Sequence, residues 1–553
     1  MLINLNKNFM NVKENDKVVY IIVSRYYNMQ ITNGSFNQQV GHVINKLNES
    51  KIKWVRLNFC DPFGLLQQIS VNSKEITEET FKKGLPRLDG SSIKGFKEIH
   101  ESDMILKPDP STFSILPNYF DKDHHNKNNN YETKAARMIV DIYEGFNGRR
   151  YLRDSRYIAQ MAGESAKKRG FEQSYWGPEL EFFVFNKMTL LPNPMSTVNC
   201  SGGSGYSIES AEAPWGQSNE SSGYTIPFKS GYFPAPPVDS LTDFRDEVSD
   251  TLKEYFGINV EAHHHEVATA GQCEIQIEYD QLVTMADKVI TYKKTVKEAA
   301  AKRNMIATFM PKPIALDNGS GMHVSQSLWG RKKGDDKQNN NEHSDDNNEH
   351  SDDNNEHNLV NLFYDPADEY AELSQTALYY IGGLMDHAKA LCALTNPTTN
   401  SYRRLIPGYE APINIAWSKM NRSASIRVPA HFRNMKNRKR IEYRTPDPSS
   451  NIYLVEAALL LAGLDGLVKK IAPPDPVDED IYKLSEEKKR EYSINKLPTS
   501  LESAIDSLES DNEFLKSAFA SDFLDMYCEI KRDEHTKVVS VPSPREFYMY
   551  SNV

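Results

Sequence analysis

The spacing of apolar and polar positions predicts a mixture of helices and strands. Apolar residues recur at helical spacing over residues 286–304 and again over 370–394, where Asn396-Pro397 ends the second pattern. Residues 53–71 instead read as two strands joined by a turn at residues 61–64. The helices and strands follow no regular βαβ period, so we expect an α+β fold.

The same patterns divide the chain into segments. Residues 1–48 are rich in asparagine and predict an N-terminal extension with weak structure. We expect a first domain over residues 49–147, which contains a strand at 137–143 near its end. A larger second domain is expected over residues 148–553, beginning with a helix near 153–169.

Two polar stretches interrupt these domains. Residues 123–130 predict a polar loop, and the unit EHSDDNN recurs every seven residues within 331–358. The repeat has no apolar position, which excludes a coiled coil. We interpret residues 331–358 as a disordered surface insertion, and a His/Asp metal-binding tract is the alternative.

Composition and charge exclude several classes of protein. The 553 residues carry a formal net charge of −11, which argues against a broad nucleic-acid-binding surface but leaves a local basic patch open. The five cysteines show no CxxC spacing, which fits a reducing compartment and argues against a cysteine-based zinc site. The longest apolar run near the start, Val18–Val23, is too short to cross a membrane, and no targeting segment is evident. We therefore expect a soluble cytoplasmic protein without a nucleic-acid or membrane partner.

Two glutamates in the apolar string WGPELEFFVF are the first candidates for chemistry. Glu179 and Glu181 are two residues apart, so a strand places both on one face. Burying two neighbouring carboxylates is costly unless metal ions or arginines neutralise them.

A second acidic pair lies in HHHEVATAGQCEIQ. Glu266 and Glu274 are symmetric about Ala270-Gly271, so a hairpin turning there makes the two carboxylates face each other. Together with Glu181 they would form a three-carboxylate site for Mg²⁺ or Mn²⁺. Two exposed surface glutamates are the alternative.

Cationic and imidazole side chains follow further along the chain. A strand over RIEYR places Arg440, Glu442 and Arg444 on one face, as the wall of a polar site or as a solvated face. His323 in NGSGMH is a candidate metal ligand or a structural histidine. The string NRSASIR contains Arg422 and Arg427, which are five residues apart. On a straight strand they would point to opposite faces, so the strand must bend if both are to contact one ligand.

Metal carboxylates beside several arginines are what phosphoryl transfer requires. Neither GxxxxGK[ST] nor GxGxxG occurs in a suitable context, so a P-loop and a Rossmann nucleotide site are excluded. The loop NPTTNSYRRLIPGYEAP contains Arg404 and Glu410 and has the composition of an active-site lid. Without further comparison, these elements predict a divalent-metal enzyme that acts on a phosphate compound.

A set of strings also occurs in the order in which one known family carries them, from about residue 50 to the C-terminus. They are LDGSSIKGF, ESDMILKPDPSTF, WGPELEFFVF, GYFPAPPVDS, EAHHHEVATAGQCE, ATFMPKP, NGSGMH, NPTTNSYRRLIPGYEAP, NRSASIR and RIEYRTPDPSSNIYL. Through them the chain resembles the glutamine synthetases of the bacterial type I class.

The resemblance implies a β-grasp domain over residues 49–147 and an α+β catalytic domain over 148–553. It implies a homo-oligomer of two stacked six-membered rings, a dodecamer, with each active site shared between neighbouring subunits. The implied activity is that of a glutamate–ammonia ligase, which converts L-glutamate, ATP and ammonia into L-glutamine, ADP and phosphate through γ-glutamyl phosphate.

The resemblance also implies roles for single residues. Mg²⁺ or Mn²⁺, two or three ions per site, would be held by two sets of ligands. The ligands of the ion that orders glutamate and ammonia would be Glu181, Glu266 and Glu274. The ligands of the ion that bridges the ATP phosphates would be Glu179, His323 and Glu442.

Other residues match substrate and nucleotide contacts. The glutamate and ammonium contacts would be Tyr232, Asn318, Gly319, Arg404 and Arg444. The nucleotide contacts would be Glu261, Tyr279, Ser327, Arg422, Arg427 and Arg440. The catalytic residues would be Asp61, Glu410 and Arg422, with Asp61 reaching into a neighbouring subunit to bind and deprotonate ammonium, and Glu410 closing the lid.

Two positions depart from the family pattern. Ser325 stands where the family often has a second histidine, which puts one polar contact in doubt. Tyr482 aligns with a tyrosine that some members adenylylate, but its flanking residues differ, so we do not expect that switch; feedback inhibition by glutamine is the alternative.

Three other functions remain to be separated from this one. A γ-glutamyl ligase that uses another amine would keep most of the same residues. A non-catalytic structural relative would have lost metal ligands, yet all six are present. A metal-dependent phosphohydrolase from outside the family would not require glutamate.

Overall fold

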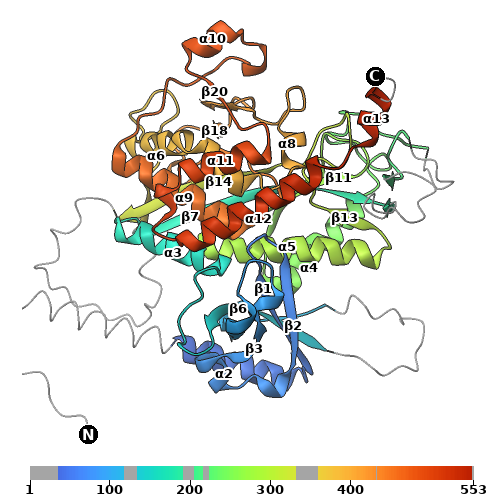
Figure 1. Ribbon diagram of the computed structural model, residues 1–553, viewed down its shortest axis with the longest axis vertical. Helices are drawn as coiled ribbons and strands as arrows, with labels where there is room; N and C mark the ends of the chain where they lie inside the picture. Colours follow the sequence, from blue (N-terminus) through green and yellow to red (C-terminus); the bar gives the residue numbers. More distant parts are fainter. Residues whose placement is uncertain are drawn as a thin grey trace, which may run out of the picture.

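The computed structural model describes residues 35–117, 134–190, 205–215, 223–331, 359–430 and 432–550 (Figure 1). The expected loop at 123–130 and nearly all of the repeat tract at 331–358 lie outside these residues, as do residues 1–34.

A small mixed sheet forms the first body of the molecule, at the bottom of Figure 1. Its strand order is β2-β1-β6-β4-β3, and β5 also pairs with β6. The strands are β1 Trp54–Cys60, β2 Leu66–Asn72, β3 Leu85–Asp89, β4 Asp103–Pro108, β5 Ser114–Ile115 and β6 Ala135–Glu144, with helix α2 Glu78–Lys83 before β3. The hairpin predicted from residues 53–71 is confirmed, since β1 and β2 pair antiparallel about a turn that Gly64 closes with a φ of 87°.

The expectation of weak structure before residue 49 is wrong for its last part. Residues 35–49 form a helix, and its Val40, Val43 and Leu47 are buried in the core of the small sheet. These apolar residues recur at three- and four-residue spacing, a pattern that the abundant asparagines of the segment obscured. The helix therefore belongs to the first body rather than to an extension.

The second body is built on a larger sheet of order β10-β11-β7-β14-β19-β18-β17. Its strands are β7 Gln173–Phe185, β10 Val260–His265, β11 Gln272–Ile277, β14 Met322–Arg331, β17 Trp417–Lys419, β18 Ile426–Val428 and β19 Ile441–Tyr443. Short strands β12 Asp280–Gln281 and β13 Ile306–Thr308 pair with β7, and β15 Leu359–Asn361 pairs with β14.

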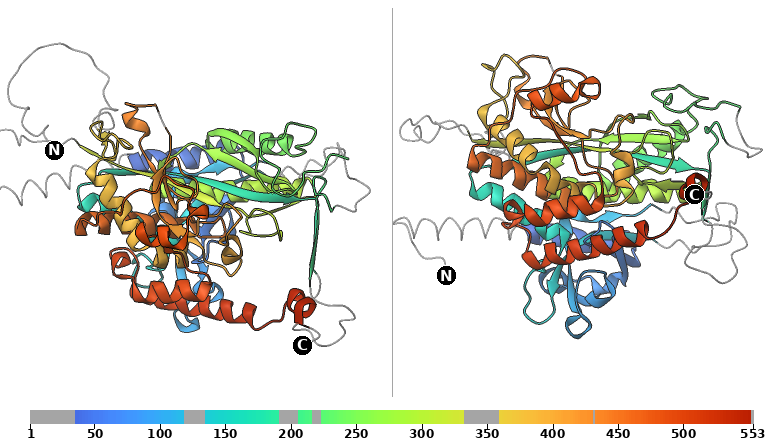
Figure 2. Two further views of the ribbon diagram at one scale, coloured as in Figure 1. Left: turned by 90° about the horizontal axis from the view of Figure 1, so that it is seen from above. Right: turned by 45° about the horizontal axis from the view of Figure 1, so that its top comes forward.

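Helices cover the face of this sheet that carries Leu180 and Phe182 of β7 (Figure 2). They include α3 Ser155–Lys168, α4 Thr242–Phe256, α5 Leu282–Lys302 and α9 Ile452–Lys469. Helix α9 is apolar on nearly all sides, which suits its packing against α3, α5, α6 (Gln375–Asp386) and α7 (Ala388–Thr395) at once. The glutamates of β7 alternate with these core residues and so point to the opposite face.

The helix expected at 370–394 is broken in two. Helices α6 Gln375–Asp386 and α7 Ala388–Thr395 meet at His387, whose backbone leaves the helical region. The imidazole of His387 bridges Asp511 at 2.8 Å and Asp465 at 2.9 Å, which fixes the break. The helices predicted at 286–304 and 153–169 are confirmed as α5 and α3.

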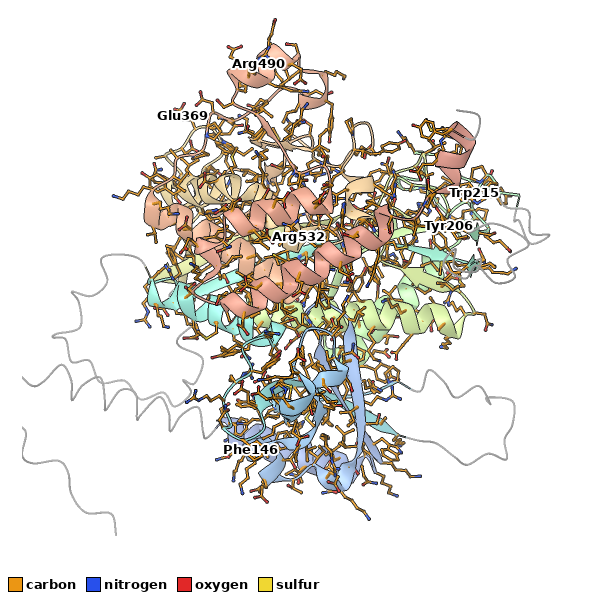
Figure 3. All side chains as sticks on the ribbon, in the orientation of Figure 1. Phe146, Tyr206, Trp215, Glu369, Arg490 and Arg532 are labelled. Carbon is orange, nitrogen blue, oxygen red and sulfur yellow. The ribbon has the colours of Figure 1, made fainter. Side chains whose placement is uncertain are left out.

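The remaining helices and strands complete the second body. They are β8 Lys187–Leu190, β9 Tyr206–Glu209, α8 Ser401–Arg404, β16 Asn414–Ile415, α10 Glu486–Glu491, β20 Asn495–Lys496, α11 Leu501–Ser510, α12 Ser521–Val539 and α13 Pro544–Tyr550. Arg532 joins α12 to α11 through ion pairs of 2.6 Å with Asp506 and 2.7 Å with Glu509 (Figure 3). Among the residues described, no helix has the length and apolar content to span a bilayer.

Candidate active site

The candidate site lies on the face of the large sheet that the core helices leave free. Strand register builds it: Glu274 of β11 pairs with Glu181 of β7, and Glu179 pairs with His323 of β14. Glu442 of β19 lies opposite Ser325, two residues beyond His323 on the same face of β14. Four strands thus bring ionisable side chains from distant parts of the sequence into one row.

The first cluster contains Glu179, His323 and Glu442. One ligating atom of each lies within 4.8 Å of the others, and His323 Nδ1 is 3.9 Å from Glu179 Oε2 and 3.7 Å from Glu442 Oε1. These are the three residues that the resemblance assigned to one ion. Two carboxylates and one imidazole suit Mn²⁺ or Mg²⁺.

The second cluster contains His264, Glu266 and Glu274. His264 Nδ1 is 3.6 Å from Glu266 Oε1, and His264 Nε2 is 3.6 Å from Glu274 Oε1. Their ligating atoms also fall within 4.8 Å of one another. This cluster shares Glu266 and Glu274 with the predicted second set, and it adds His264, which sequence reasoning missed.

The register expected for the β10–β11 hairpin is wrong by two residues. The residue opposite Glu274 is His264, and Glu266 lies beyond the end of β10, where its N–H donates to the carbonyl of Gln272 at 2.9 Å. The turn itself sits where expected, with φ of 60° at Ala270 and 80° at Gly271. The alternation of His264 and Glu266 in the HHHE string would have revealed His264 as a residue of the same face.

Glu181 lies between the clusters and is already hydrogen-bonded. Its Oε2 accepts from the N–H of Gly321 at 3.0 Å and from Nε2 of Gln272 at 3.0 Å. A Cβ added to Gly321 would lie 2.7 Å from Arg404 Nη2 and 3.1 Å from His323 Nε2. A glycine at this position therefore keeps the space between the two clusters open.

Burial and like charge dominate the electrostatics of the site. Burial, then the carboxylates of Glu442 and Glu274, raises the pKa of Glu179 to about 8. Burial, then Glu181 and Glu274, raises the pKa of Glu266 to about 9. Burial and the surrounding arginines hold the pKa of His323 well below its usual value, so its imidazole is neutral and free to bind a metal.

Arginines line the other wall of the cavity. Arg444 Nη1 donates to Glu442 Oε1 at 2.7 Å, and Arg427 Nε donates to Glu442 Oε2. Arg404 is buried and donates to the carbonyl of Thr445 at 2.7 Å. Arg422 lies before β18 rather than on it, so the required bend exists and both it and Arg427 line the cavity.

The cavity enclosed by these groups has a volume of about 190 Å³. The residues predicted to contact glutamate and ammonium also line it, together with the predicted lid residue Glu410; they are Tyr232, Asn318, Gly319, Arg404 and Arg444. The side-chain Oδ1 of Asn318 and the Nε of Arg444 are buried without a hydrogen-bond partner among the described residues. Such orphaned polar atoms fit a bound polar ligand.

A second cavity of about 470 Å³ shares Glu179 and Gln276 with the first. Four of the predicted nucleotide residues line it, namely Glu261, Tyr279, Ser327 and Arg440. Tyr175 packs edge-on against Tyr279 and Trp329, with ring centroids 5.6 and 5.4 Å apart, so the cavity has an aromatic wall. Tyr175 and Trp329 were not predicted from the sequence as site residues, because neither had been assigned a role from a motif.

Two residues of interest lie outside both cavities. The carboxylate of Asp61 accepts from the N–H groups of Phe63 and Leu65 at 2.9 Å each, within its own turn. Asp61 does not line the cavity of its own chain. Tyr482 is partly exposed, and its hydroxyl donates to the carbonyl of Ala411 at 3.0 Å, next to the lid residue Glu410.

Comparison with known proteins bears on both bodies. Residues 51–145 match the family described as "Glutamine synthetase, beta-Grasp domain", and residues 152–357 and 354–550 match "Glutamine synthetase, catalytic domain". The chain is 49% identical over 505 residues to a glutamine synthetase of Sulfolobus acidocaldarius, covering 91% of this chain and 96% of that protein.

Two further similarities extend this finding. A glutamine synthetase of Escherichia coli K12 is 41% identical over 521 residues, covering 93% of this chain and 99% of that protein. Among solved structures, Plasmodium falciparum glutamine synthetase superposes with a TM-score of 0.76 at 26% identity, covering 93% of this chain and 98% of that one.

Proposed function

This chain belongs to the glutamine synthetase family, and on that premise we propose that the two clusters and their arginines carry out its reaction. The enzyme is a glutamate–ammonia ligase that uses ATP and divalent metal ions. Its α+β fold, with a β-grasp domain before the catalytic domain, is that of the family.

The reaction consists of two displacements. In the first, an oxygen of the glutamate γ-carboxylate attacks the γ-phosphorus of ATP, and ADP leaves. In the second, ammonia attacks the acyl carbon of γ-glutamyl phosphate, and phosphate leaves with the oxygen that came from glutamate. Both steps move negative charge between oxygens, which cationic groups in a water-poor cavity stabilise.

The donor sets fit divalent cations. Both clusters combine carboxylates with one imidazole within 4.8 Å, and raised pKa values show that the carboxylates lack sufficient neutralisation in the metal-free protein. We assign Glu179, His323 and Glu442 to one ion and Glu266, Glu274 and His264 to another, with Glu181 beside the second. Bound there, Mg²⁺ or Mn²⁺ would supply electrostatic stabilisation of phosphate and carboxylate oxygens.

The arginines and lid residues then act on the substrates. We assign Arg404 and the unpaired Oδ1 of Asn318 to glutamate, with Gly319 beside them. We assign Arg422, Arg427 and Arg444 to the transferred phosphoryl group, because all three line the cavity and two of them, Arg427 and Arg444, donate to the metal-ligand candidate Glu442. The neighbouring aromatic cavity, with Glu261, Tyr279, Ser327 and Arg440, is assigned to the nucleotide.

Ammonium must lose a proton before it can attack. Glu410 is exposed and lines the cavity, as does Tyr232, and we assign Glu410 the role of closing the site and accepting that proton. Asp61 cannot contribute from its own chain, because its carboxylate is held in its own turn. We therefore place its role in a neighbouring subunit, within a dodecamer of two stacked six-membered rings.

The observation that carries this assignment is the row of ligands across four strands. Two adjacent three-residue clusters on one sheet face, flanked by arginines, match the need to bring ATP and glutamate together. A simple phosphohydrolase has no use for the second, carboxylate-rich cluster beside an amino-acid pocket.

The test is product stoichiometry. With ATP, Mg²⁺, glutamate and ammonium, we expect glutamine and phosphate to form one to one, and neither to form when glutamate is omitted. Product formation with methylamine but not with ammonium would move the assignment to another γ-glutamyl ligase. Phosphate release without glutamate would support a phosphohydrolase, and no turnover from an intact oligomer would support a structural relative.

A further inference from the structure

Tyr409 precedes the lid residue Glu410, and two lysine ammonium groups lie over its ring. Lys312 Nζ is 3.7 Å from the ring centroid, and Lys229 Nζ is 4.2 Å from it. Both distances are well inside the range over which a cation is attracted to an aromatic face. We call Lys229 and Lys312 the lysine clamp.

Each lysine is itself anchored to the site. Lys229 Nζ also donates to the carbonyl of Gly408 at 2.9 Å, so it holds the lid through both backbone and ring. Lys312 Nζ donates to the carbonyl of Asp317. The backbone N–H of Lys312 donates to Asn400 Oδ1 at 2.7 Å, and Asn400 Nδ2 donates back to the carbonyl of Lys312 at 3.0 Å.

Asp317 connects the clamp to the substrate pocket. Its buried carboxylate accepts from the backbone N–H groups of Lys229 at 3.0 Å, Thr269 at 2.8 Å and Asn318 at 3.0 Å. These three residues come from the clamp, from the turn between β10 and β11, and from the amino-acid pocket. One carboxylate thus fixes the three loops relative to one another.

The lid needs such support because its backbone is not in a favoured conformation. Glu410 has a φ of 61°, which a residue with a Cβ rarely adopts, and Gly408 has a φ of 90°. Residues 406–408 are exposed to solvent. Contacts to the ring and to the backbone around Glu410 must therefore maintain this geometry.

The surroundings of Lys312 disfavour its charged form on balance. Burial, with Lys229 and Arg404 nearby, lowers the pKa of Lys312 to about 8, against the opposing effect of Asp317. No carboxylate among the described residues forms a salt bridge with either Lys229 or Lys312. The electron-rich face of Tyr409 is the neighbour that both ammonium groups share.

We propose that the lysine clamp grips Tyr409 and so positions Glu410 over the cavity during ammonia transfer. Tyr409, Lys229 and Lys312 are positioning residues, since they act through Glu410. The proposal rests on the function proposed above, because it assigns the clamp to protection of γ-glutamyl phosphate from water and to placement of the proton acceptor.

The experiment compares Lys229→Met, Lys312→Met, Tyr409→Leu and Tyr409→Phe in the full chain. Methionine keeps the apolar stem of lysine without its charge, and phenylalanine keeps the aromatic face. Lys107→Met is the matched control, because Lys107 lies over the ring of Tyr143 at 5.4 Å, in the small domain and remote from the lid.

The first readout is the ratio of phosphate released to glutamine formed. We expect each lysine variant and Tyr409→Leu to raise this ratio about two- to fivefold, the range expected for one cation–π contact, and Tyr409→Phe and the control to keep it near one. A ratio that stays near one in all variants, with glutamine made at the wild-type rate, would overturn the proposal.

The second readout does not depend on activity. Amide hydrogen exchange over residues 405–411 should become faster in the three disrupting variants than in wild type, and should not change in Tyr409→Phe or Lys107→Met. Unchanged exchange in Lys229→Met and Lys312→Met would contradict the clamp. Wild-type protein that makes no glutamine while the variants show faster exchange would refute the proposed function and leave the clamp supported.

Discussion

Glu266 and Glu179 show how burial and like charge act together on single residues. Their carboxyl groups have pKa values of about 9 and about 8, because burial and neighbouring carboxylates disfavour the charged forms. In the metal-free protein they therefore keep protons at pH 7. A divalent cation reverses this preference because its ligands must be deprotonated.

The first prediction is that metal binding releases protons. At pH 7, titration of the metal-free protein with Mn²⁺ should release about one to two protons per chain, because Glu179 and Glu266 lose theirs. Calorimetry in buffers of different ionisation enthalpy measures this number. It should fall toward zero as the pH rises past 9, and a binding heat independent of the buffer at pH 7 would contradict the prediction.

The same groups set the sign of the pH effect on stability without metal. Through Glu179 and Glu266 the folded state binds more protons than the unfolded state between pH 4.5 and about 9, so the contribution of these two groups to stability should fall as the pH rises through that range. Saturating Mn²⁺ should remove this trend.

Gly321 provides the second residue-scale prediction. A Cβ there would meet Arg404 Nη2 at 2.7 Å, His323 Nε2 at 3.1 Å and Glu181 Oε1 at 3.2 Å. Gly321→Ala should therefore weaken Mn²⁺ binding about tenfold or more while the fold is kept. Gly163→Ala is the control, because its Cβ would meet nothing within 4 Å. Equal Mn²⁺ affinity in both variants would show that the space beside Gly321 has no role.

Among the secondary-structure elements, the junction of α6 and α7 depends on one ionisable side chain. His387 is buried and stacks on Phe514 with ring centroids 4.0 Å apart. Its imidazole contacts Asp465 of α9 and Asp511, the residue that follows α11. These two carboxylates raise the pKa of His387 against the effect of burial. Its stabilisation is therefore fully present below pH 6.5 and is lost as the pH rises through the higher folded value.

His387→Gln tests this junction. The variant should lower the free energy of unfolding by about 1 kcal/mol more at pH 6 than at pH 9, a value kept small because Asp511 is partly exposed. Thermal or urea unfolding at the two pH values, with exposed His100→Gln as the control, gives the comparison. A loss of equal size at both pH values would show that charge on His387 does not stabilise the junction.

At the scale of the whole molecule, the two bodies meet through both apolar and polar contacts. Cys60 and Ile139 of the small sheet belong to the core of the second body, and Arg156 of α3 pairs with Asp109 and Asp141. Asn451 Nδ2, at the start of α9, donates to the carbonyl of Asp61 at 3.0 Å and to Ser155 Oγ at 2.8 Å. The backbone of Asp61 is thus held where the two bodies meet, while its buried carboxylate accepts hydrogen bonds within its own turn and does not line the cavity of its own chain. A catalytic role for Asp61 then requires a second subunit.

A hybrid oligomer tests this requirement. Asp61→Asn and Glu179→Gln should each be inactive alone, yet rings assembled from an equal mixture should recover about a quarter of wild-type activity, because one site in four combines the two intact halves. Mixing after assembly, without exchange of subunits, is the control. Hybrids that stay inactive would contradict a site shared between subunits.

The periodicity of the sequence correctly predicted the long helices and strands, and which nearby residues share one face of a strand. The β1–β2 hairpin, α5 and the shared face of Glu179 and Glu181 follow from periodicity alone. The pairing of His264 with Glu274 could not be predicted, because register depends on where the turn residues place the strand ends. Tyr175 and Trp329 were missed for a related reason: an aromatic wall arises only when β7 and β14 pair.

The transfer of oxygen from glutamate to phosphate tests the central claim most directly. With glutamate labelled by ¹⁸O in its γ-carboxylate, and with ATP and ammonium, the released phosphate should carry one labelled oxygen per glutamine formed. This follows because the attacking carboxylate oxygen stays on phosphorus when ammonia displaces phosphate. Phosphate whose new oxygen comes from water instead would show that the site hydrolyses ATP without forming γ-glutamyl phosphate, and would contradict the account.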